Sequence, residues 1–191
     1  DGDSQNNFLR AALGSGDVLT KAWAGRPVWQ VYDMALGKHI GFSARATQNA
    51  SSFIFNQGFS ATDAHIALLG DPSLRLHPLR RVSNLTANFI AGNIDLTWEN
   101  SADATHGNFI YRRINGGEWE LVATFHSGNS FSDPCVAPNT DYEYLVKAIR
   151  LEHTGSGSYF NTSLGRSTAI AISENPAIIA FFADTDLDGF G

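Results

Sequence analysis

The chain has 191 residues, of which 43% are hydrophobic and 17% are charged, and this composition is typical of globular proteins rather than of disordered ones. The formal net charge is -6, and basic residues adjoin one another only at Arg80-Arg81 and Arg112-Arg113, which argues against a nucleic-acid partner. The longest uncharged apolar run, Ala177 to Ala183, is too short for a transmembrane segment, and a single cysteine, Cys135, excludes an internal disulfide.

The N-terminal part of the chain mixes helix and strand patterns. Pro27 suits the first turn of a helix, and apolar residues then recur at three- and four-residue steps as far as Leu36, so we expect a helix that Gly37 ends. A second helix is expected at about 38–47. The stretch HIALLGDP, residues 65–72, predicts a short buried strand that runs into a sharp turn, because its proline bars further helix or sheet.

Further along the chain, the pattern changes to short alternating segments separated by turn signals, and we place the boundary at about 78–82. Gly92-Asn93 and Gly116-Gly117 are hairpin-type turn signals. Strands are expected at about 83–89, 93–99, 107–114, 118–125, 140–152 and 166–173. Strands at this regular spacing predict an antiparallel β-sandwich, and therefore a mainly β fold class.

The stretch VAPNTDYEYLVKAI resembles the corner between strands E and F of fibronectin type III domains. The family pattern places an apolar residue, a proline, a threonine and a tyrosine where this chain has Val136, Pro138, Thr140 and Tyr142. The tyrosine ring packs into the sandwich while its hydroxyl bonds to main chain upstream. The resemblance therefore implies a corner held by Tyr142.

Two further features extend this resemblance over residues 82–173. Trp98 stands where the family usually has its core tryptophan on strand B, and NFIYRRI, residues 108–114, fits strand C. The resemblance implies an immunoglobulin-like β-sandwich that acts as a spacer or adhesion module. It points to no functional site inside the domain, because the matching residues are core residues.

The stretch HIALLGDPSLRLHP, with WAGRPVW and ALGKHIGFSARATQN before it, is similar to the closing part of gingipain-like cysteine peptidases, which have a caspase-like α/β fold. This resemblance covers residues 7–77 and implies that residues 1–78 form a partial α/β segment. The family's catalytic histidine and cysteine lie upstream of the matching part. His39 and His65 have no thiol in the same segment, and a Cys–His dyad needs both groups within hydrogen-bond reach. We therefore expect no catalytic residue in this chain.

The last residues, FFADTDLDGFG, place Asp184, Asp186 and Asp188 at every second position, followed by Gly189. Calcium takes about six to eight oxygen ligands, and this spacing lets successive carboxylates curl around one ion. The stretch resembles the thrombospondin type 3-like repeats that link domains in secreted bacterial proteins, which implies a calcium linker with these aspartates as metal ligands. The alternative is a solvated acidic linker.

The run AIIAFFA, within residues 174–191, lies outside both expected domains and is apolar and β-prone. Added to an exposed sheet edge of a neighbouring copy, and repeated head to tail, such a strand builds a fibre. The alternative is a strand that docks on its own domain.

The patterns together favour a non-catalytic structural or adhesive segment of a larger secreted or cell-surface bacterial protein. Its partners would be other domains of the parent protein or neighbouring copies of itself, with calcium as the bound ion. We expect the chain to be one part of a longer exported polypeptide. The alternative function is the C-terminal part of a gingipain-like cysteine endopeptidase whose catalytic half lies upstream.

Overall fold

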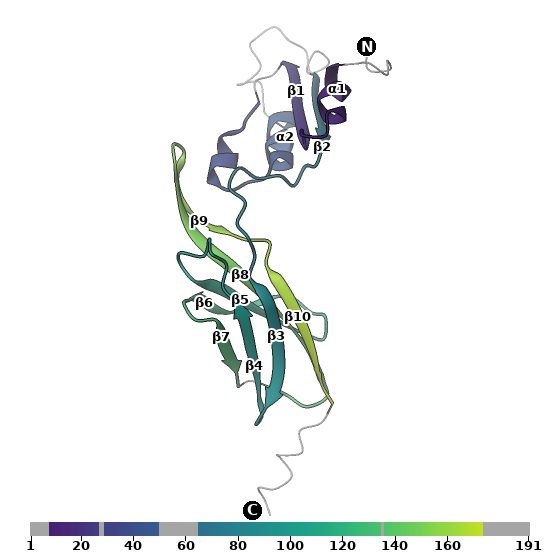
Figure 1. Cartoon of the computed structure of the whole chain (residues 1–191). Coiled ribbons are helices and arrows are strands. Elements are labelled where there is room, and N and C mark those ends of the chain that lie inside the picture. Colours follow the sequence, from purple (N-terminus) through teal and green to yellow (C-terminus); the bar gives the residue numbers. More distant parts are fainter. Residues whose placement is uncertain (1–7, 27–28, 50–64, 135, 174–191) are drawn as a thin grey trace, which may run out of the picture. The chain divides into compact units, whose positions relative to one another are not determined.

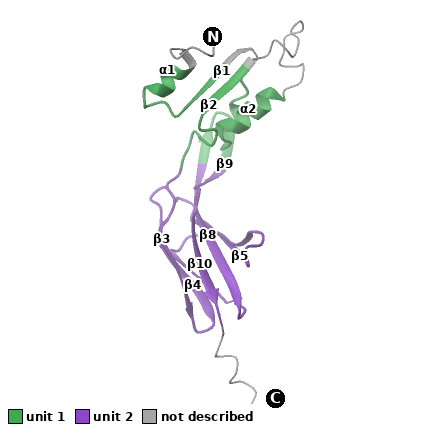
Figure 2. Ribbon diagram, turned by 90° about the vertical axis from the view of Figure 1, so that its right-hand side faces the viewer, with its two compact units in different colours: residues 1–78, 152–159 green, residues 79–151, 160–191 purple. Residues whose placement is uncertain are grey.

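The computed structural model describes residues 8–26, 29–49, 65–134 and 136–173 (Figure 1). The chain divides into two compact units, which Figure 2 distinguishes by colour. Unit 1 consists of residues 1–78 and 152–159, and unit 2 consists of residues 79–151 and 160–191.

Unit 1 combines short helices with a two-stranded antiparallel sheet. Strand β1 (Thr20–Arg26) pairs with β2 (His65–Gly70), with Thr20 opposite Gly70 at one end. Gly70 has a φ of +101° and lies against the main chain of Leu19, where a side chain would clash, so the tight crossing at this end of the sheet requires glycine. The elements are α1 (Phe8–Gly14), β1 (Thr20–Arg26), the 3₁₀ helix η1 (Tyr32–Leu36), α2 (Ile40–Gln48) and β2 (His65–Gly70).

Helix α2 lies close to its expected position because its ends are well capped. The Nδ1 atom of His39 accepts a hydrogen bond from the Phe42 N–H at 3.1 Å, which satisfies one of the free donors of the first turn. Thr47 is fully buried in the last turn, where its hydroxyl donates to the Ser43 carbonyl and accepts from the Gln30 N–H. These contacts fasten the helix to the segment before η1.

The helix expected up to Leu36 is instead the five-residue 3₁₀ helix η1, so this prediction was wrong in type and length over the described residues. Gly37 does end it, in the left-handed conformation, with its N–H donated to the Asp33 and Met34 carbonyls. Val31 and Tyr32 are 49% and 58% exposed. Packing of an apolar face supplies most of the stability of a short helix. Because the side chains of Val31 and Tyr32 stay largely in solvent, a longer helix here would gain little from packing.

The peptidase-like fold expected for residues 1–78 is not confirmed. The two described strands of this part pair antiparallel, whereas the expected α/β fold has a parallel sheet. Unit 1 also includes the tip of a hairpin from later in the chain, where the Thr154 hydroxyl donates to the Ala35 carbonyl at 2.9 Å.

Unit 2 is a β-sandwich of two antiparallel sheets, as expected. One sheet has the order β3-β4-β7, and the other has the order β10-β8-β5-β6, with β9 also paired to β8. This arrangement is of the immunoglobulin-like, fibronectin type III-like class. The strands are β3 (Ser83–Ile90), β4 (Asn93–Glu99), β5 (Asn108–Ile114), β6 (Glu120–His126), β7 (Ser130–Asp133), β8 (Thr140–Thr154), β9 (Gly157–Thr162) and β10 (Arg166–Ile172).

The core of the sandwich follows from alternation along the strands, because successive side chains point to opposite faces of a sheet. On β4 the residues Ile94, Leu96 and Trp98 are buried, with exposed or half-buried residues between them. On β8 the buried face begins with Tyr142 and Tyr144 and continues through Val146 and Ala148. Trp98 and Tyr142 therefore belong to one apolar core between the two sheets.

Candidate functional site

The residues predicted to bind calcium, Asp184, Asp186 and Asp188, lie outside the described residues, as does Cys135. Within the described ranges, no group of three or more histidine, cysteine, aspartate or glutamate side chains is placed to hold a metal ion. Nor does the described part contain a helix that is long and apolar enough to cross a membrane. The calcium site stays a prediction.

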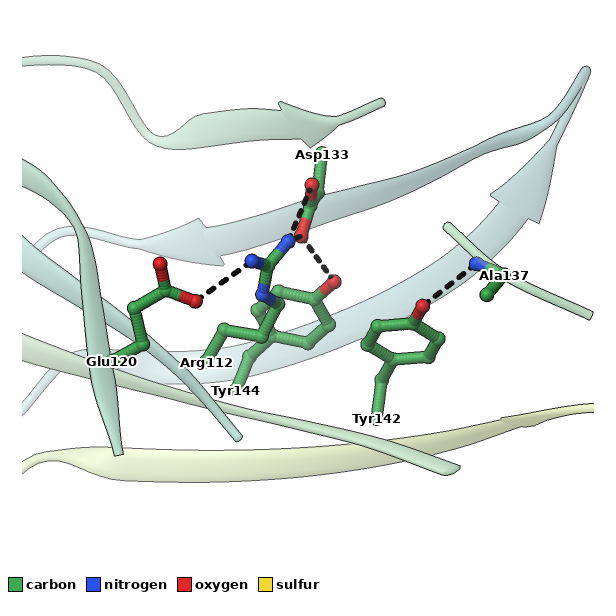
Figure 3. Close-up of polar contacts among 6 residues, drawn as sticks. All are labelled: Arg112, Glu120, Asp133, Ala137, Tyr142 and Tyr144. Atoms are coloured by element: carbon green, nitrogen blue, oxygen red, sulfur yellow. Dashed lines mark hydrogen bonds and ion pairs between the residues drawn. The ribbon is translucent and has the colours of Figure 1, made fainter. Parts of the chain in front are cut away.

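The tyrosine corner predicted at Tyr142 is confirmed. Its ring is buried in the core, and its hydroxyl accepts a hydrogen bond from the Ala137 N–H at 2.7 Å (Figure 3). Thr140, between these residues, closes a small turn by donating from its hydroxyl to the Pro138 carbonyl at 3.0 Å. The corner thus fastens the loop before β8 to the body of the sandwich.

The second polar feature of unit 2 is a buried ionic cluster, formed by Arg112, Glu120, Asp133 and Tyr144. Arg112 comes from β5 and Asp133 from β7, so the cluster joins the two sheets. The Nη1 atom of Arg112 lies 2.9 Å from Oδ2 of Asp133, and its Nη2 atom lies 2.8 Å from Oε2 of Glu120. The Tyr144 hydroxyl donates to Oδ2 of Asp133 at 2.7 Å. Figure 3 shows the guanidinium between the two carboxylates.

Burial makes this ionic cluster energetically significant. The side chain of Arg112 is 13% exposed and that of Asp133 is 4% exposed, whereas Glu120 lies at the surface. The Nε atom of Arg112 is buried and has no hydrogen-bond partner among the described residues. A buried charge whose partner is removed is strongly destabilising, so Asp133 is the residue on which the cluster depends.

The electrostatics keep both donors of the ionic cluster protonated. Burial alone would lower the pKa of Arg112, but its hydrogen bonds to Glu120 and Asp133 outweigh burial and raise this pKa further above its already high value. The pKa of Tyr144 is raised, first by burial and then by the hydrogen bond to Asp133. Neither group therefore exchanges a proton near neutral pH, as a general acid or base must.

The geometry of the ionic cluster is suited to holding the sheets together rather than to chemistry. Both oxygens of Asp133 accept from Arg112, and one of them also accepts from Tyr144. A carboxylate that is buried and fully hydrogen-bonded has no free position from which to reach a substrate. We assign the cluster a structural role that joins the sheet containing β5 to the sheet containing β7.

The histidines singled out in the sequence lie in unit 1. His39 caps α2 through its Nδ1 atom, and the Gly41 N–H donates to the Pro72 carbonyl at 2.9 Å, which fastens the start of the helix to the turn after β2. His65 is the first residue of β2. The contacts of His39 are those of a structural cap.

No family model matches the chain. An amylopullulanase from Thermoanaerobacterium saccharolyticum is 30% identical over 84 residues, which is 44% of this chain but 7% of the relative. The chain therefore matches only a small part of that protein.

Similar solved structures include fibronectin type III domains. A Fn3-like protein from Clostridium thermocellum is 19% identical with a TM-score of 0.39, over 52% of this chain and 98% of that one. An FN3 domain of human collagen XX is 18% identical with a TM-score of 0.36, over 53% and 100%. A β-1,2-glucanase from Parabacteroides distasonis is 21% identical with a TM-score of 0.36, over 61% and 17%.

Proposed function

We propose that the chain is a non-catalytic structural or adhesive segment of a larger secreted or cell-surface bacterial protein. The observation that carries this proposal is the buried ionic cluster of unit 2, in which Asp133 accepts hydrogen bonds from Arg112 and Tyr144 inside the domain. The partial match to a much longer amylopullulanase supports a place within a multidomain protein. A sandwich whose two sheets are joined by such a cluster is suited to holding other domains apart or to presenting a contact surface.

The proposal is tested by assaying the purified chain for hydrolysis of casein and of pullulan, because a cysteine peptidase would cleave the first and an amylopullulanase the second. We expect no turnover above that of a heat-denatured sample. Turnover that disappears in a folded Cys135→Ser variant would contradict the non-catalytic role, and turnover that depends on Asp133 would give the ionic cluster a catalytic role.

The calcium linker is part of the same proposal. Three aspartates at alternate positions present hard oxygen ligands, which calcium prefers. We expect calcium to raise the melting temperature of the chain or of its C-terminal segment, and Asp186→Ala to abolish this shift. An unchanged melting temperature in excess calcium would leave only the solvated acidic linker.

The fibre hypothesis is separable from both. If residues 177–183 add to a sheet edge of a neighbouring copy, a chain without residues 177–191 should be monomeric while the full chain assembles. Size-exclusion chromatography with light scattering measures this directly. Equal assembly of the two chains would exclude strand exchange through this segment.

A further inference from the structure

The outer face of the β8-β5-β6 part of the sandwich carries aromatic rings rather than the polar residues that a solvated sheet face usually has. On β5, Asn108 and Ile110 are buried, so Phe109 and Tyr111 point to the opposite, outer face. The register with β8 places Lys147 opposite Phe109 on that face. The aromatic residues therefore lie on the side of the sheet that does not contact the core.

Three of these rings form one group, the phenylalanine cluster, which consists of Phe109, Phe125 and Phe160. Phe125 is the central member, with its ring centroid 5.3 Å from that of Phe109 and 4.8 Å from that of Phe160. Both pairs meet edge to face, at 70° and 66°. Phe125 and Phe160 are 46% and 47% exposed, so about half of each ring is open to solvent although the rings contact one another.

The backbone of Phe125 adopts a conformation that a bulky residue rarely has. Its φ is +51°, in the left-handed region that favours glycine. The β5–β6 register shifts from Asn108 opposite His126 to Ile110 opposite Ala123, so Phe125 lies in a β-bulge. Bulges commonly re-aim a side chain, and strained backbone often marks functional positions. The bulge at Phe125 therefore sets the direction in which its ring projects from the sheet.

The size of the open surface limits what binds to it. An aromatic side chain has ~200 Å² of surface, so the open halves of Phe125 and Phe160 amount to roughly 200 Å². A stable protein pair buries ~800 Å² on each partner. Peptides are bound mainly in grooves or by backbone pairing along free sheet edges; Phe125 belongs to the edge strand β6, but its ring lies on the face of the sheet and not along its edge. A narrow, extended ligand therefore fits the cluster better than a second copy of the chain or a peptide.

The charges around the cluster favour an uncharged ligand. Farther along β5, Arg113 is paired with Glu143 at 2.8 Å, so these two charges compensate each other. The Nζ atom of Lys147 lies 5.4 Å from the centroid of the Tyr111 ring, in a cation–π contact. The exposed rings of the phenylalanine cluster therefore share this face with charges that already have a partner, either an ion pair or an aromatic ring.

We propose that the phenylalanine cluster binds an uncharged polysaccharide chain. The carbon–hydrogen faces of a sugar ring are apolar and carry a small positive polarisation, which complements the negative face of an aromatic ring. The exposed parts of Phe125 and Phe160 supply the aromatic surface for this contact. This inference rests on the proposed adhesive function and names its ligand class.

The test is co-sedimentation of the full chain with granular starch and with microcrystalline cellulose. We expect retention on at least one of them, and at least a fivefold lower bound fraction for Phe125→Gly and for Phe160→Ser. Glycine adopts the φ of residue 125 without strain, so Phe125→Gly should keep its melting temperature within a few degrees. The matched control is Leu164→Ser, an exposed apolar residue of unit 2, which should bind as the unchanged chain does.

Three results would overturn the proposal: no retention of the unchanged chain on either polymer, equal retention of Phe125→Gly, or an equal loss in Leu164→Ser. A concentration-dependent dimer in sedimentation velocity that Phe125→Gly abolishes, without polymer binding, would instead identify a second copy as the occupant. Hydrolysis of the polymers during the assay would contradict the non-catalytic function and leave the binding result readable, because retention is measured separately.

Discussion

Replacing Asp133 by alanine tests the structural role of the buried ionic cluster. The change leaves the guanidinium of Arg112, 13% exposed, with only the surface carboxylate of Glu120, and it leaves the buried Tyr144 hydroxyl without its acceptor. Breaking a buried pair by removing one partner costs ~3–5 kcal/mol, and the remaining Glu120 contact places the expected loss near ~3 kcal/mol. At ~4–8 °C per kcal/mol for a domain of this size, unit 2 should melt about 12–24 °C lower.

The matched control for Asp133→Ala removes the three buried polar groups of the cluster at once and leaves only the surface residue Glu120. A triple variant, Arg112→Met with Asp133→Leu and Tyr144→Phe, leaves no buried charge or hydroxyl unpaired in the cluster. It should be as stable as the unchanged chain or more so, because apolar residues of similar volume often replace buried ion pairs without loss. Urea unfolding followed by hydrogen exchange of the β8 core amides reports on unit 2. A cost under about 1 kcal/mol for Asp133→Ala would refute this reasoning.

Three further changes probe other parts of the chain. Tyr142→Phe removes the corner hydroxyl and should cost unit 2 ~1 kcal/mol in urea unfolding, and an unchanged midpoint would contradict the corner's role. Gly37 has a φ of +87°, and the Cβ added by Gly37→Ala would lie 2.5 Å from the Tyr159 ring, so this change should cost ~1–2 kcal/mol or more. The loss should appear as faster hydrogen exchange of the η1 amides, and equal exchange would disprove the clash. The pKa of Asp103 is lowered from 3.8 to about 2, mainly by its hydrogen bond to Arg80. A lowered pKa stabilises the fold above 3.8, and this contribution is lost as the pH falls toward about 2. Plotted against pH over that window, the melting temperature should fall less steeply for Asp103→Asn than for the unchanged chain. Parallel plots for the two proteins would contradict this.

The strands of unit 2 were largely predictable because alternation and turn signals agree there. The expected strand at 140–152 corresponds to β8, and a hairpin turn joins β3 to β4 at Ala91-Gly92, one residue before the predicted Gly92-Asn93. Two strands were missed for physical reasons. β7 has four residues, SFSD, too few for a period-two pattern, and β9 lies in the glycine-rich stretch TGSGSYFN, whose composition is typical of a loop.

The tyrosine corner was predictable because all its residues are adjacent in sequence. The buried ionic cluster was not, although one signal existed: the alternation Asn108, Ile110, Arg112 places an arginine on the inward side of β5. Its partner Asp133 lies on β7 in the other sheet, so no sequence spacing connects the two residues. The same holds for Phe125, whose outward direction depends on a bulge that alternation cannot reveal.

The most direct test of a non-catalytic role is hydrolytic turnover by the purified chain and by its Asp133→Asn variant, measured on casein and on pullulan beside far-ultraviolet circular dichroism of both proteins. We predict no turnover from either, because the one buried carboxylate described in the core of unit 2 is held by Arg112 and Tyr144. Turnover by the unchanged chain that is lost in a folded Asp133→Asn variant would contradict this role.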